Sequence, residues 1–510
     1  MEAPCIPVRE IIEGPSDAAS LMGGEISYEK DLEVKRADVY AASIASVSSA
    51  GTPVCPDHPD CDNWGPATFI ERHGLDNVNS AHTVRHVAPD YDMVSLLQEV
   101  VGSAEDQDPA FVVDLSVVMR KLSDWKLLMP RIHPFYAIKC NGDDAICRML
   151  ADSGCGFDCA SKAEIEAALA YGAPPHLIIY ANPCKQASML RYARSVGVTK
   201  MTADNVEELY KIKQIHPEAE VVLRIAVDDS KSVCRFNSKF GAPPAEWDAL
   251  LATCRDVGLD VAGFSFHVGS GCGDLKPFAD AVGSAREAFD LAATYGFTPK
   301  LLDCGGGYPG HDEGYSFAEV AAVLREAVDH YFPPEEGVTV IAEPGRYMVS
   351  ASHTYAVAVI AKRQLSEAQL ADTAEIESFG QRANKDTEED EAAVEDAFKK
   401  AEVIHDDSTP EVALYINDGV YGSFNCVVFD HAVVVPRVFK PVGADVVPTK
   451  LFGPTCDSID VVMPCTRLPE LKVGDWIWFD NMGAYTRCAA SKFNGQGNHS
   501  IHYVWSGMPQ

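Results

Sequence analysis

The feature that most limits the fold of this chain is a regular alternation of short apolar runs with amphipathic stretches, sustained from Phe111 to about residue 352. Each apolar run is rich in β-branched or aromatic residues and has the length of one strand. Strand and helix repeated in this way give parallel strands, because each helix carries the chain back to the start of the next strand. About eight units in ~250 residues match a (β/α)8 barrel, with a doubly wound open sheet as the alternative.

Nine runs compete for the eight strand positions of such a barrel, so we expect one to lie outside it or not to be a strand. They are residues 111–113, 135–138, 157–160, 177–181, 200–202, 221–226, 263–268, 300–304 and 338–342. Helices are expected between them, among them residues 204–215, residues 277–295 and a helix that ends near Gly172. Ser161 and Glu164 have capping-box spacing at the start of that last helix.

After about His353 the helical pattern stops, and the remaining strand-like runs predict an all-β second domain. The runs are residues 355–360, 412–416, 432–438, 476–479 and 501–505. Residues 367–411 interrupt them with 15 acidic against four basic side chains, which indicates an exposed insertion. The predicted plan is a flexible extension (1–75), one or more strands that join the β-domain (76–107), the barrel (108–352) and the β-domain (353–510).

The overall charge excludes several classes of partner. Forty-two Lys plus Arg against 75 Asp plus Glu give a net charge of -33, which repels nucleic acid and anionic membrane surfaces. No apolar run reaches the ~18 residues of a membrane span. The 16 cysteines follow no disulfide framework, which favours a reducing, cytoplasmic setting. Cys55, His58 and Cys61 lie close together but lack a fourth ligand, so we expect a loop and no metal.

Three side chains with possible chemistry end predicted barrel strands, where barrel enzymes place their reactive groups. Lys139 follows an apolar run; it could be a salt-bridged structural lysine, or a desolvated one with a lowered pKa that forms a Schiff base. Asp158 could be a turn residue or a charge beside that lysine. His267 could be a core histidine, but the Gly269–Ser270–Gly271 segment behind it offers N–H groups and a hydroxyl to an anion.

Two more strand ends carry features of an anion-binding site. Gly305, Gly306 and Gly307 would let the backbone approach a phosphate closely. Glu343 ends the last strand, with Arg346 three residues later. The two could form a simple ion pair, or they could hold a protonated ring nitrogen and a phosphate, respectively.

Taken together and in order, these motifs resemble a known family. FYAIKCN (135–141), HVGSGC (267–272), GGG (305–307), EPGR (343–346) and CDSID (456–460) resemble the fold-type III, pyridoxal-phosphate-dependent basic amino-acid decarboxylases, and among them the eukaryotic ornithine decarboxylases. The resemblance covers about residues 78–503 apart from the acidic insertion. It implies an alanine-racemase-like barrel with a β-domain, and pyridoxal 5′-phosphate as cofactor.

The resemblance also implies roles for individual residues. Lys139 would hold the cofactor covalently, His267 would stack on its ring, and Glu343 would keep its ring nitrogen protonated. The other cofactor contacts implied are Asp158 and Arg224 near the cofactor, and Ser270, Gly305, Gly306, Gly307, Pro344, Gly345, Arg346 and Tyr485 around the phosphate.

In the family a cysteine that matches Cys456 returns a proton to Cα and comes from the partner subunit. A homodimer with shared active sites follows, in which Lys239 and Asp460 would pair across the interface. The segment Phe429–Asp430 and Asp457 would grip the distal ammonium of a diamino acid. The implied reaction converts L-ornithine to putrescine and carbon dioxide, the first step of polyamine biosynthesis.

Several alternatives remain open at this stage. The substrate could be lysine, arginine or diaminopimelate, although diaminopimelate decarboxylases usually have Glu where this chain has Asp457. A catalytically silent homologue of the antizyme-inhibitor type would share the fold, and an antizyme-type regulator is a possible partner. An amino-acid racemase is disfavoured, because it needs a second base where this chain has Cys456 beside carboxylates.

Overall fold

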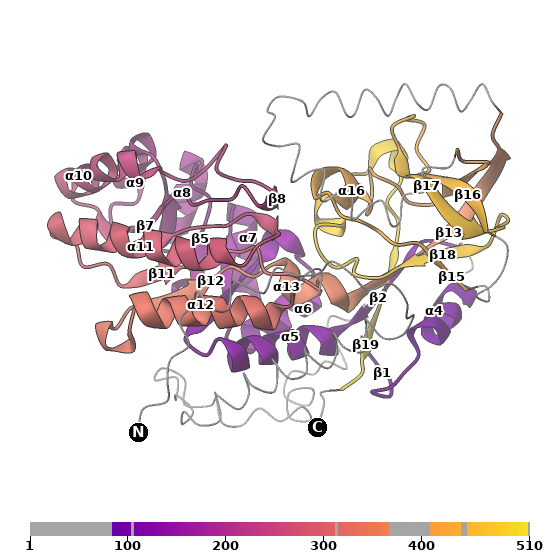
Figure 1. Ribbon diagram of the computed structural model, residues 1–510, viewed down its shortest axis with the longest axis horizontal. Helices are drawn as coiled ribbons and strands as arrows, with labels where there is room; N and C mark the ends of the chain where they lie inside the picture. The colour runs from indigo at the N-terminus through magenta and orange to yellow at the C-terminus, as the bar shows by residue number, and fades with distance from the viewer. Residues whose placement is uncertain (1–83, 104–106, 312–314, 367–408, 440–445, 508–510) are drawn as a thin grey trace, which may run out of the picture.

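The computed structural model describes residues 84–103, 107–311, 315–366, 409–439 and 446–507. These residues form two domains side by side, a barrel and a β-rich domain, with helix α13 (Arg346–Val349) at their junction. Figure 1 shows the barrel on the left and the β-rich domain on the right. The flexible extension predicted for residues 1–75 and the cluster of Cys55, His58 and Cys61 lie outside the described residues, as does most of the acidic insertion.

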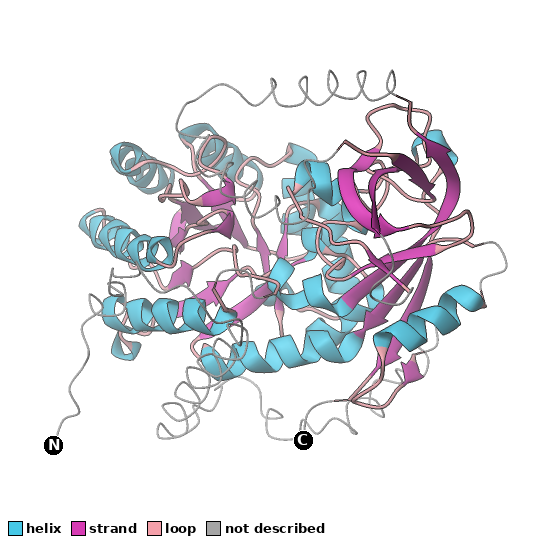
Figure 2. Cartoon of the chain, turned by 45° about the vertical axis from the view of Figure 1, so that its right-hand side comes forward, coloured by secondary structure: helices cyan, strands magenta, loops and turns pink. Residues whose placement is uncertain are grey.

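The first domain is a closed barrel of eight parallel strands, as predicted. Consecutive strands are neighbours all the way round, and the helices lie outside them (Figure 2). The strands are β3 (Ile132–Ala137), β4 (Gly156–Cys159), β5 (Ile178–Tyr180), β6 (Lys200–Ala203), β7 (Glu220–Arg224), β9 (Asp260–Ser265), β11 (Leu301–Asp303) and β12 (Thr339–Ala342). The helices are α5 (Leu115–Leu128), α6 (Asp144–Asp152), α7 (Lys162–Ala170), α8 (Ala187–Ser195), α9 (Val206–Ile215), α10 (Trp247–Val257), α11 (Lys276–Thr294) and α12 (Phe317–Tyr331).

Side chains on both faces of the barrel strands are apolar, which explains the near-continuous apolar runs in the sequence. One buried cluster draws on five different strands: Phe135, Ile179, Val222, Leu301 and Ile341. The much larger second cluster joins the other strand faces to the surrounding helices. Because both faces are buried, the strands hold a fixed position and their carboxyl ends converge on one site.

The second domain is built on a mixed sheet with the strand order β1-β19-β2-β13-β14-β16-β17, with β18 also paired to β13 and to β15. The strands are β1 (Arg85–His86), β2 (Ala110–Asp114), β13 (His353–Gln364), β14 (Val412–Ile416), β15 (Arg437–Val438), β16 (Val446–Phe452), β17 (Val461–Pro469), β18 (Trp476–Phe479) and β19 (Ser500–Trp505). Helix α4 (Met93–Gly102) packs against this sheet, and the short helix α16 (Asn425–Phe429) lies nearer the barrel.

Strand β2 is the ninth candidate of the sequence analysis. It pairs with β13 and β19 and has no partner in the barrel. Strand β2 therefore lies in the sheet of the second domain, although the predicted barrel range (108–352) includes it. The predicted domain limits stay a prediction.

Three local expectations differ from the structure. Of residues 432–438 only β15 is a strand, and β16 and β17 were not predicted. Strand β17 contains Pro464, which argues against an interior strand, but β17 is the last strand of its sheet, where proline is tolerated. At helix α7 the Ser161 hydroxyl accepts from Glu164 N at 3.3 Å, but the Glu164 carboxylate accepts from Ala160 N, so the capping box is incomplete.

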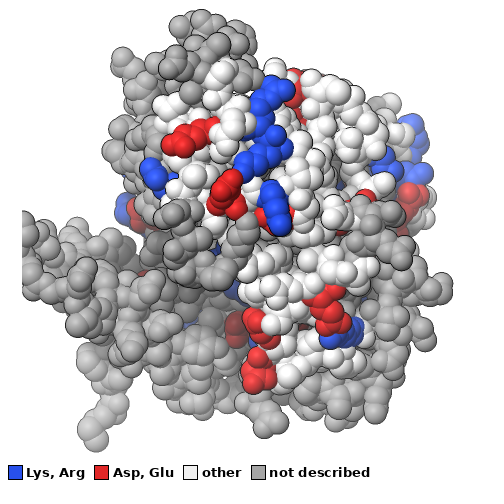
Figure 3. Space-filling view, turned by 90° about the vertical axis from the view of Figure 1, so that its right-hand side faces the viewer, with Lys and Arg blue, Asp and Glu red and all other residues white. Residues whose placement is uncertain are grey.

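The described surface carries both signs of charge. On the face that the β-rich domain turns outward, basic and acidic side chains lie close to one another (Figure 3). In the part of the chain that the structure describes, no helix is both long and apolar enough to cross a membrane. Within the same residues, no three His, Cys, Asp or Glu side chains are arranged to hold a metal ion.

Candidate active site

Lys139 lies in a single helical turn, Ile138–Cys140, directly after β3. Its Nζ is 2.5 Å from Oδ2 of Asp158, which points from the neighbouring strand β4. Burial alone would lower the pKa of Lys139, but the charges of Asp158 and Glu343 outweigh it and raise the pKa. Of the two alternatives left open by the sequence, the structure shows the ion-paired lysine and not the lowered pKa, because an apolar run before a residue does not reveal the carboxylates on adjacent strands.

Glu343 follows β12 and faces a second carboxyl group, Asp303, at the end of β11. Burial first, then the charges of Asp158 and Asp303, hold the pKa of Glu343 well above its usual range. Burial raises the pKa of Asp303 to about 7. Asp303 Oδ1 accepts a hydrogen bond from Gly305 N at 2.9 Å, whereas Asp303 Oδ2 and Glu343 Oε1 are buried without a protein partner. Because the pKa of each carboxyl group is raised, the pair favours keeping a proton.

His267 is a neutral imidazole. Burial, followed by the charges of Arg224 and Lys139, holds its pKa well below the usual range. Its Nδ1 accepts a hydrogen bond from Gly269 N at 3.0 Å, which places the ring proton on Nε2. Phe236 meets the ring edge-on, with centroids 4.8 Å apart. The ring is thus fixed from two sides at the end of β9.

The three consecutive glycines after β11 keep the backbone close to these groups. A Cβ on Gly306 would lie 2.8 Å from His267 Nε2 and 3.0 Å from the Glu343 carbonyl oxygen. Gly307 has φ +101°, and a Cβ there would lie 2.4 Å from the Gly269 carbonyl oxygen. Only glycine fits both positions, which leaves room for a ligand beside His267 and Glu343.

Arg346 contacts two other side chains predicted to bind phosphate, Ser270 and Tyr485. Its guanidinium donates to Ser270 Oγ at 3.1 Å and lies 5.1 Å from the ring centroid of Tyr485. Its ion-pair partner is Asp430 Oδ1 at 2.6 Å, not Glu343, so the simple Glu343–Arg346 pair considered from the sequence does not form. A residue predicted to bind phosphate and one predicted to bind substrate are therefore in direct contact.

The other predicted cofactor residues surround the same place. Arg224 ends β7, is charged and contributes to the low pKa of His267. The Pro344 carbonyl accepts from Ala137 N at 3.1 Å. A Cβ on Gly345 would lie 2.9 Å from Cys140 Cβ, so this backbone packs directly on the Lys139 turn.

The donor set fits pyridoxal phosphate. An amine for the aldehyde, a carboxyl group with an orphaned buried oxygen for the ring nitrogen, and an arginine–serine–glycine cluster for the phosphate lie around one strand end. Lys139, Glu343 and Arg346 would hold its three functional groups. The sequence reached these residues through motif resemblance, but it missed Asp303, whose only signal was its position just before the glycine run.

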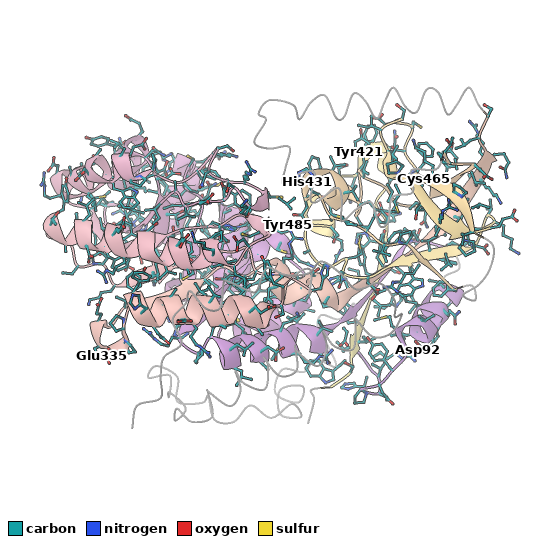
Figure 4. All side chains as sticks on the ribbon, in the orientation of Figure 1. Asp92, Glu335, Tyr421, His431, Cys465 and Tyr485 are labelled. Atoms are coloured by element: carbon teal, nitrogen blue, oxygen red, sulfur yellow. The ribbon has the colours of Figure 1, made fainter. Side chains whose placement is uncertain are left out.

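Cys456 and Asp457 lie in a different environment, on the loop between β16 and β17. Cys456 is exposed in this chain and Asp457 is half-buried, with Asp457 Oδ2 accepting from the Tyr421 hydroxyl at 2.5 Å. That bond lowers the pKa of the Asp457 carboxyl. In the view of Figure 4, Tyr421 lies above and to the right of Tyr485, whose N–H bonds to the carbonyl oxygen of Cys140 in the Lys139 turn. Among the described residues, no hydrogen bond or ion pair joins the Cys456 loop to Lys139.

The remaining predicted residues divide in the same way. Phe429 is 72% exposed at the end of α16, whereas Asp430 beside it is largely buried against Arg346. Lys239 is exposed and lies over the Phe240 ring. Asp460 is buried in its own chain, where it accepts from Val420 N and from the amide and hydroxyl of Thr455. A pair between Lys239 and Asp460 of two subunits stays a prediction.

Comparison with known proteins identifies related decarboxylases. Residues 115–350 match the family described as "Pyridoxal-dependent decarboxylase, pyridoxal binding domain". The ornithine decarboxylase of Rattus norvegicus is 45% identical over 409 residues, 80% of this chain and 82% of that protein. That of Schizosaccharomyces pombe is 44% identical over 415 residues (79% and 85%). Antizyme inhibitor 2 of Xenopus laevis is 44% identical over 416 residues (81% and 84%).

Solved structures give the same fold. The arginine decarboxylase of Paramecium bursaria Chlorella virus superimposes with a TM-score of 0.69 at 30% identity, covering 81% of this chain and 100% of that one. The lysine/ornithine decarboxylase of Vibrio vulnificus, complexed with cadaverine, gives 0.65 at 26% identity (80% and 97%). Fold and site thus define a pyridoxal-phosphate-dependent decarboxylase with an alanine-racemase-like barrel. Within that class, the chain belongs to the ornithine decarboxylase family.

Proposed function

We propose that this protein decarboxylates L-ornithine to putrescine and carbon dioxide, and so performs the first step of polyamine biosynthesis. The observation that carries the proposal is the contact of Lys139 with the buried Asp158, next to the protonated pair of Glu343 and Asp303. An amine nucleophile and a buried acid at one barrel end are what a lysine-bound pyridoxal enzyme requires.

Each residue has a defined part in the reaction. Lys139 would hold the cofactor covalently through Nζ until a substrate amine takes that place, and Asp158 would hold a proton at Nζ. Glu343 keeps a proton at the ring nitrogen, and neutral His267 limits the space beside the ring without adding a positive charge. When bound, pyridoxal phosphate supplies the electron sink that makes loss of carbon dioxide from Cα possible. Cys456 then donates its thiol proton to Cα.

Substrate choice rests on Asp430 and Asp457. A terminal ammonium between carboxylates gains most where water is excluded, which favours a diamino acid. Because solved relatives include decarboxylases for arginine and for lysine or ornithine, the deciding assay compares carbon dioxide release from ornithine, lysine, arginine and diaminopimelate. Ornithine should have the highest kcat/KM; a higher value for lysine or arginine would overturn the substrate assignment.

One specific observation supports a second candidate, a regulatory protein without activity. Antizyme inhibitor 2 of Xenopus laevis is as similar to this chain as the decarboxylases are. Purified protein that is yellow and gives a borohydride-reduced cofactor on Lys139 supports the enzyme. Colourless protein that binds an antizyme-type partner supports the regulator.

The quaternary proposal is a homodimer with shared sites. It is supported by the exposure of Cys456 and by exposed apolar side chains near its loop and on α16: Phe429 (72%), Ile459 (58%) and Phe493 (43%). Mixing inactive Lys139→Ala and Cys456→Ala chains should restore part of the activity, because one site of a mixed dimer is intact. No recovery in a verified mixed dimer contradicts shared sites. We also propose a cytoplasmic setting, supported by the free thiols of all cysteines in the described residues.

A further inference from the structure

The backbone of the proton-donor cysteine is held by a distant part of the chain. The N–H of Cys456 donates to Oδ1 of Asn494 at 3.0 Å. The loop that carries Cys456 (residues 453–460, the Cys456 loop) closes at its base, where Gly453 N donates to the Asp460 carbonyl oxygen at 2.8 Å. The bond to Asn494 therefore holds the loop at Cys456 itself and is separate from the bond between Gly453 and Asp460 that closes the loop.

Asn494 is fixed in turn. Its φ is 53°, a left-handed conformation that asparagine tolerates better than most residues, so its position depends on the surrounding segment. Ser491 N donates to the Tyr421 carbonyl oxygen at 2.8 Å, and Phe493 packs on the Tyr421 ring with centroids 4.5 Å apart.

Tyr421 closes the arrangement, because its hydroxyl donates to Asp457 Oδ2 at 2.5 Å. Two adjacent residues of the Cys456 loop are therefore bonded to two partners: the Cys456 backbone to Asn494, and the Asp457 side chain to Tyr421, whose ring packs on the neighbour of Asn494, Phe493. Such a pair of bonds fixes the loop against rotation as well as translation.

We propose that Asn494 is a positioning residue that sets where the Cys456 thiol delivers its proton. The proposal rests on the function assigned to Cys456 above. Asn494 touches neither cofactor nor reacting atoms; it acts through the Cys456 backbone. Displacing a reacting group by ~1 Å can cost as much as ~10²-fold in rate, so one bond at the cysteine has a measurable consequence.

The consequence differs from a simple loss of activity. After carbon dioxide leaves, a proton from the Cys456 thiol to Cα gives putrescine, and the thiolate regains a proton from solvent. If that transfer is slow, a solvent proton adds to the cofactor carbon instead. Water then releases the carbon skeleton as an aminoaldehyde, and the amino group stays on the cofactor. A misplaced thiol therefore lowers the yield of putrescine per carbon dioxide.

The test compares Asn494→Gly with Asn494→Asp. Glycine keeps the left-handed backbone and removes the acceptor, whereas aspartate keeps an acceptor oxygen in place. We expect Asn494→Gly to lower kcat ~10-fold and the putrescine to carbon dioxide ratio below that of the wild type, with KM changed less than about 2-fold. Asn494→Asp should restore the ratio.

Asn417→Gly is the matched control, because the Asn417 carboxamide also accepts a backbone N–H, that of Ala358, at 2.8 Å in the same domain. The control should retain the wild-type ratio even if it is less stable. An Asn494→Gly enzyme with the wild-type ratio, or an equal fall in Asn417→Gly, overturns the proposal.

Mixed dimers separate this inference from the shared-site proposal. If sites are shared, a Lys139→Ala, Asn494→Gly chain paired with wild type has one functional lysine, and that lysine faces the altered loop, so the product ratio falls. Pairing Lys139→Ala with Asn494→Gly leaves the functional lysine facing an unaltered loop, so the ratio stays normal. The reversed pattern refutes shared sites but keeps the role of Asn494, and equal ratios in both refute the role.

A readout without catalysis covers the case in which ornithine is not decarboxylated. The Cys456 amide should exchange its hydrogen at least ~10-fold faster in Asn494→Gly than in the wild type or in Asn494→Asp. Fast exchange without activity would refute the proposed function alone. Unchanged exchange would refute the anchoring by Asn494 regardless of activity.

Discussion

The two halves of the proposed site differ in how complete they are within one chain. At the barrel end, Lys139, Asp158 and Glu343 are bonded or charge-paired to each other, and Asp158 is fully buried. On the β-rich domain, Cys456 is exposed and Asp457 half-buried, and among the described residues their bonds are to Asn494 and Tyr421 of the same domain. The barrel half has its electrostatics in place, whereas the β-domain half has its geometry in place but no reaction partner.

Because of this difference, we expect the two halves to respond differently to mutation. Changes in the barrel half should alter cofactor binding and colour, because they remove groups that hold the cofactor. Changes in the Cys456 loop should leave both intact and alter only the fate of the substrate.

Removing the Lys139 amine should have the largest effect. Lys139→Ala should lower kcat by at least ~10³-fold, since the covalent attachment is lost. Borohydride reduction followed by peptide mass spectrometry should find no labelled peptide for residues 135–141. Lys162→Ala, on the exposed side of α7, should label and react normally. Normal labelling of the Lys139→Ala protein would place the covalent site elsewhere.

Neutralising Glu343 should follow. Glu343→Gln cannot balance a protonated ring nitrogen, so kcat should fall ~10²–10³-fold with the covalent linkage kept. The absorbance spectrum of the bound cofactor should change as well. Glu336→Gln, which removes an exposed partner of Arg286, is the control. Wild-type activity in Glu343→Gln would show that Asp303 can take over its role.

Removing the Cys456 thiol should leave the barrel half untouched. Cys456→Ala should slow putrescine formation ~10²-fold, because the proton donor is lost, while the cofactor absorbance stays unchanged. Cys184→Ala removes another exposed thiol and should be silent. Loss of cofactor from Cys456→Ala would contradict the separation of the two halves.

The smallest effect at neutral pH concerns His353, which is fully buried where β13 meets the Lys139 segment and bonds to Asn141. Burial lowers its pKa from 6.5 to about 4. Between these values the unfolded chain binds more protons than the folded one, so stability falls with pH from 6.5 toward 4. The full loss from this group is about 3 kcal/mol.

Urea unfolding at a series of pH values checks this. Relative to its own value at pH 7, His353→Gln should lose less stability by pH 4 than the wild type does. An unchanged slope in His353→Gln would assign the acid sensitivity to another buried histidine with a lowered pKa, His267 foremost, because the raised pKa values of Asp303 and Glu343 stabilise the fold as the pH falls.

Much of the fold could be predicted because it depends on the spacing of apolar residues within each strand and helix. Eight of the nine predicted runs are the barrel strands, since strands buried on both faces must be short and apolar and are separated by amphipathic helices. The ninth, β2, has the same local character, and only its pairing with β13 and β19 assigns it to the other sheet. The residues of one strand do not reveal which distant strand it will pair with.

For the site as well, the residues could be predicted from the sequence but their contacts could not. Order and spacing of the motifs identified Lys139, His267, Glu343 and Arg346, because strand ends of a barrel converge whatever the loops between them. The raised pKa of Lys139 and the contact of Arg346 with Asp430 depend on neighbours from other strands and the other domain.

By itself, then, the sequence determined the alternation that closes the barrel and the residue types at its strand ends. Only the tertiary structure decided which carboxyl groups act on each other at the barrel end, which residue holds the Cys456 backbone, and that Arg346 pairs with Asp430. The physical reason is the sequence distance over which each effect acts: the hydrophobic periods of strands and helices can be recognised within ten or twenty residues. Hydrogen bonds and charges act over a few ångströms between segments that hundreds of residues can separate.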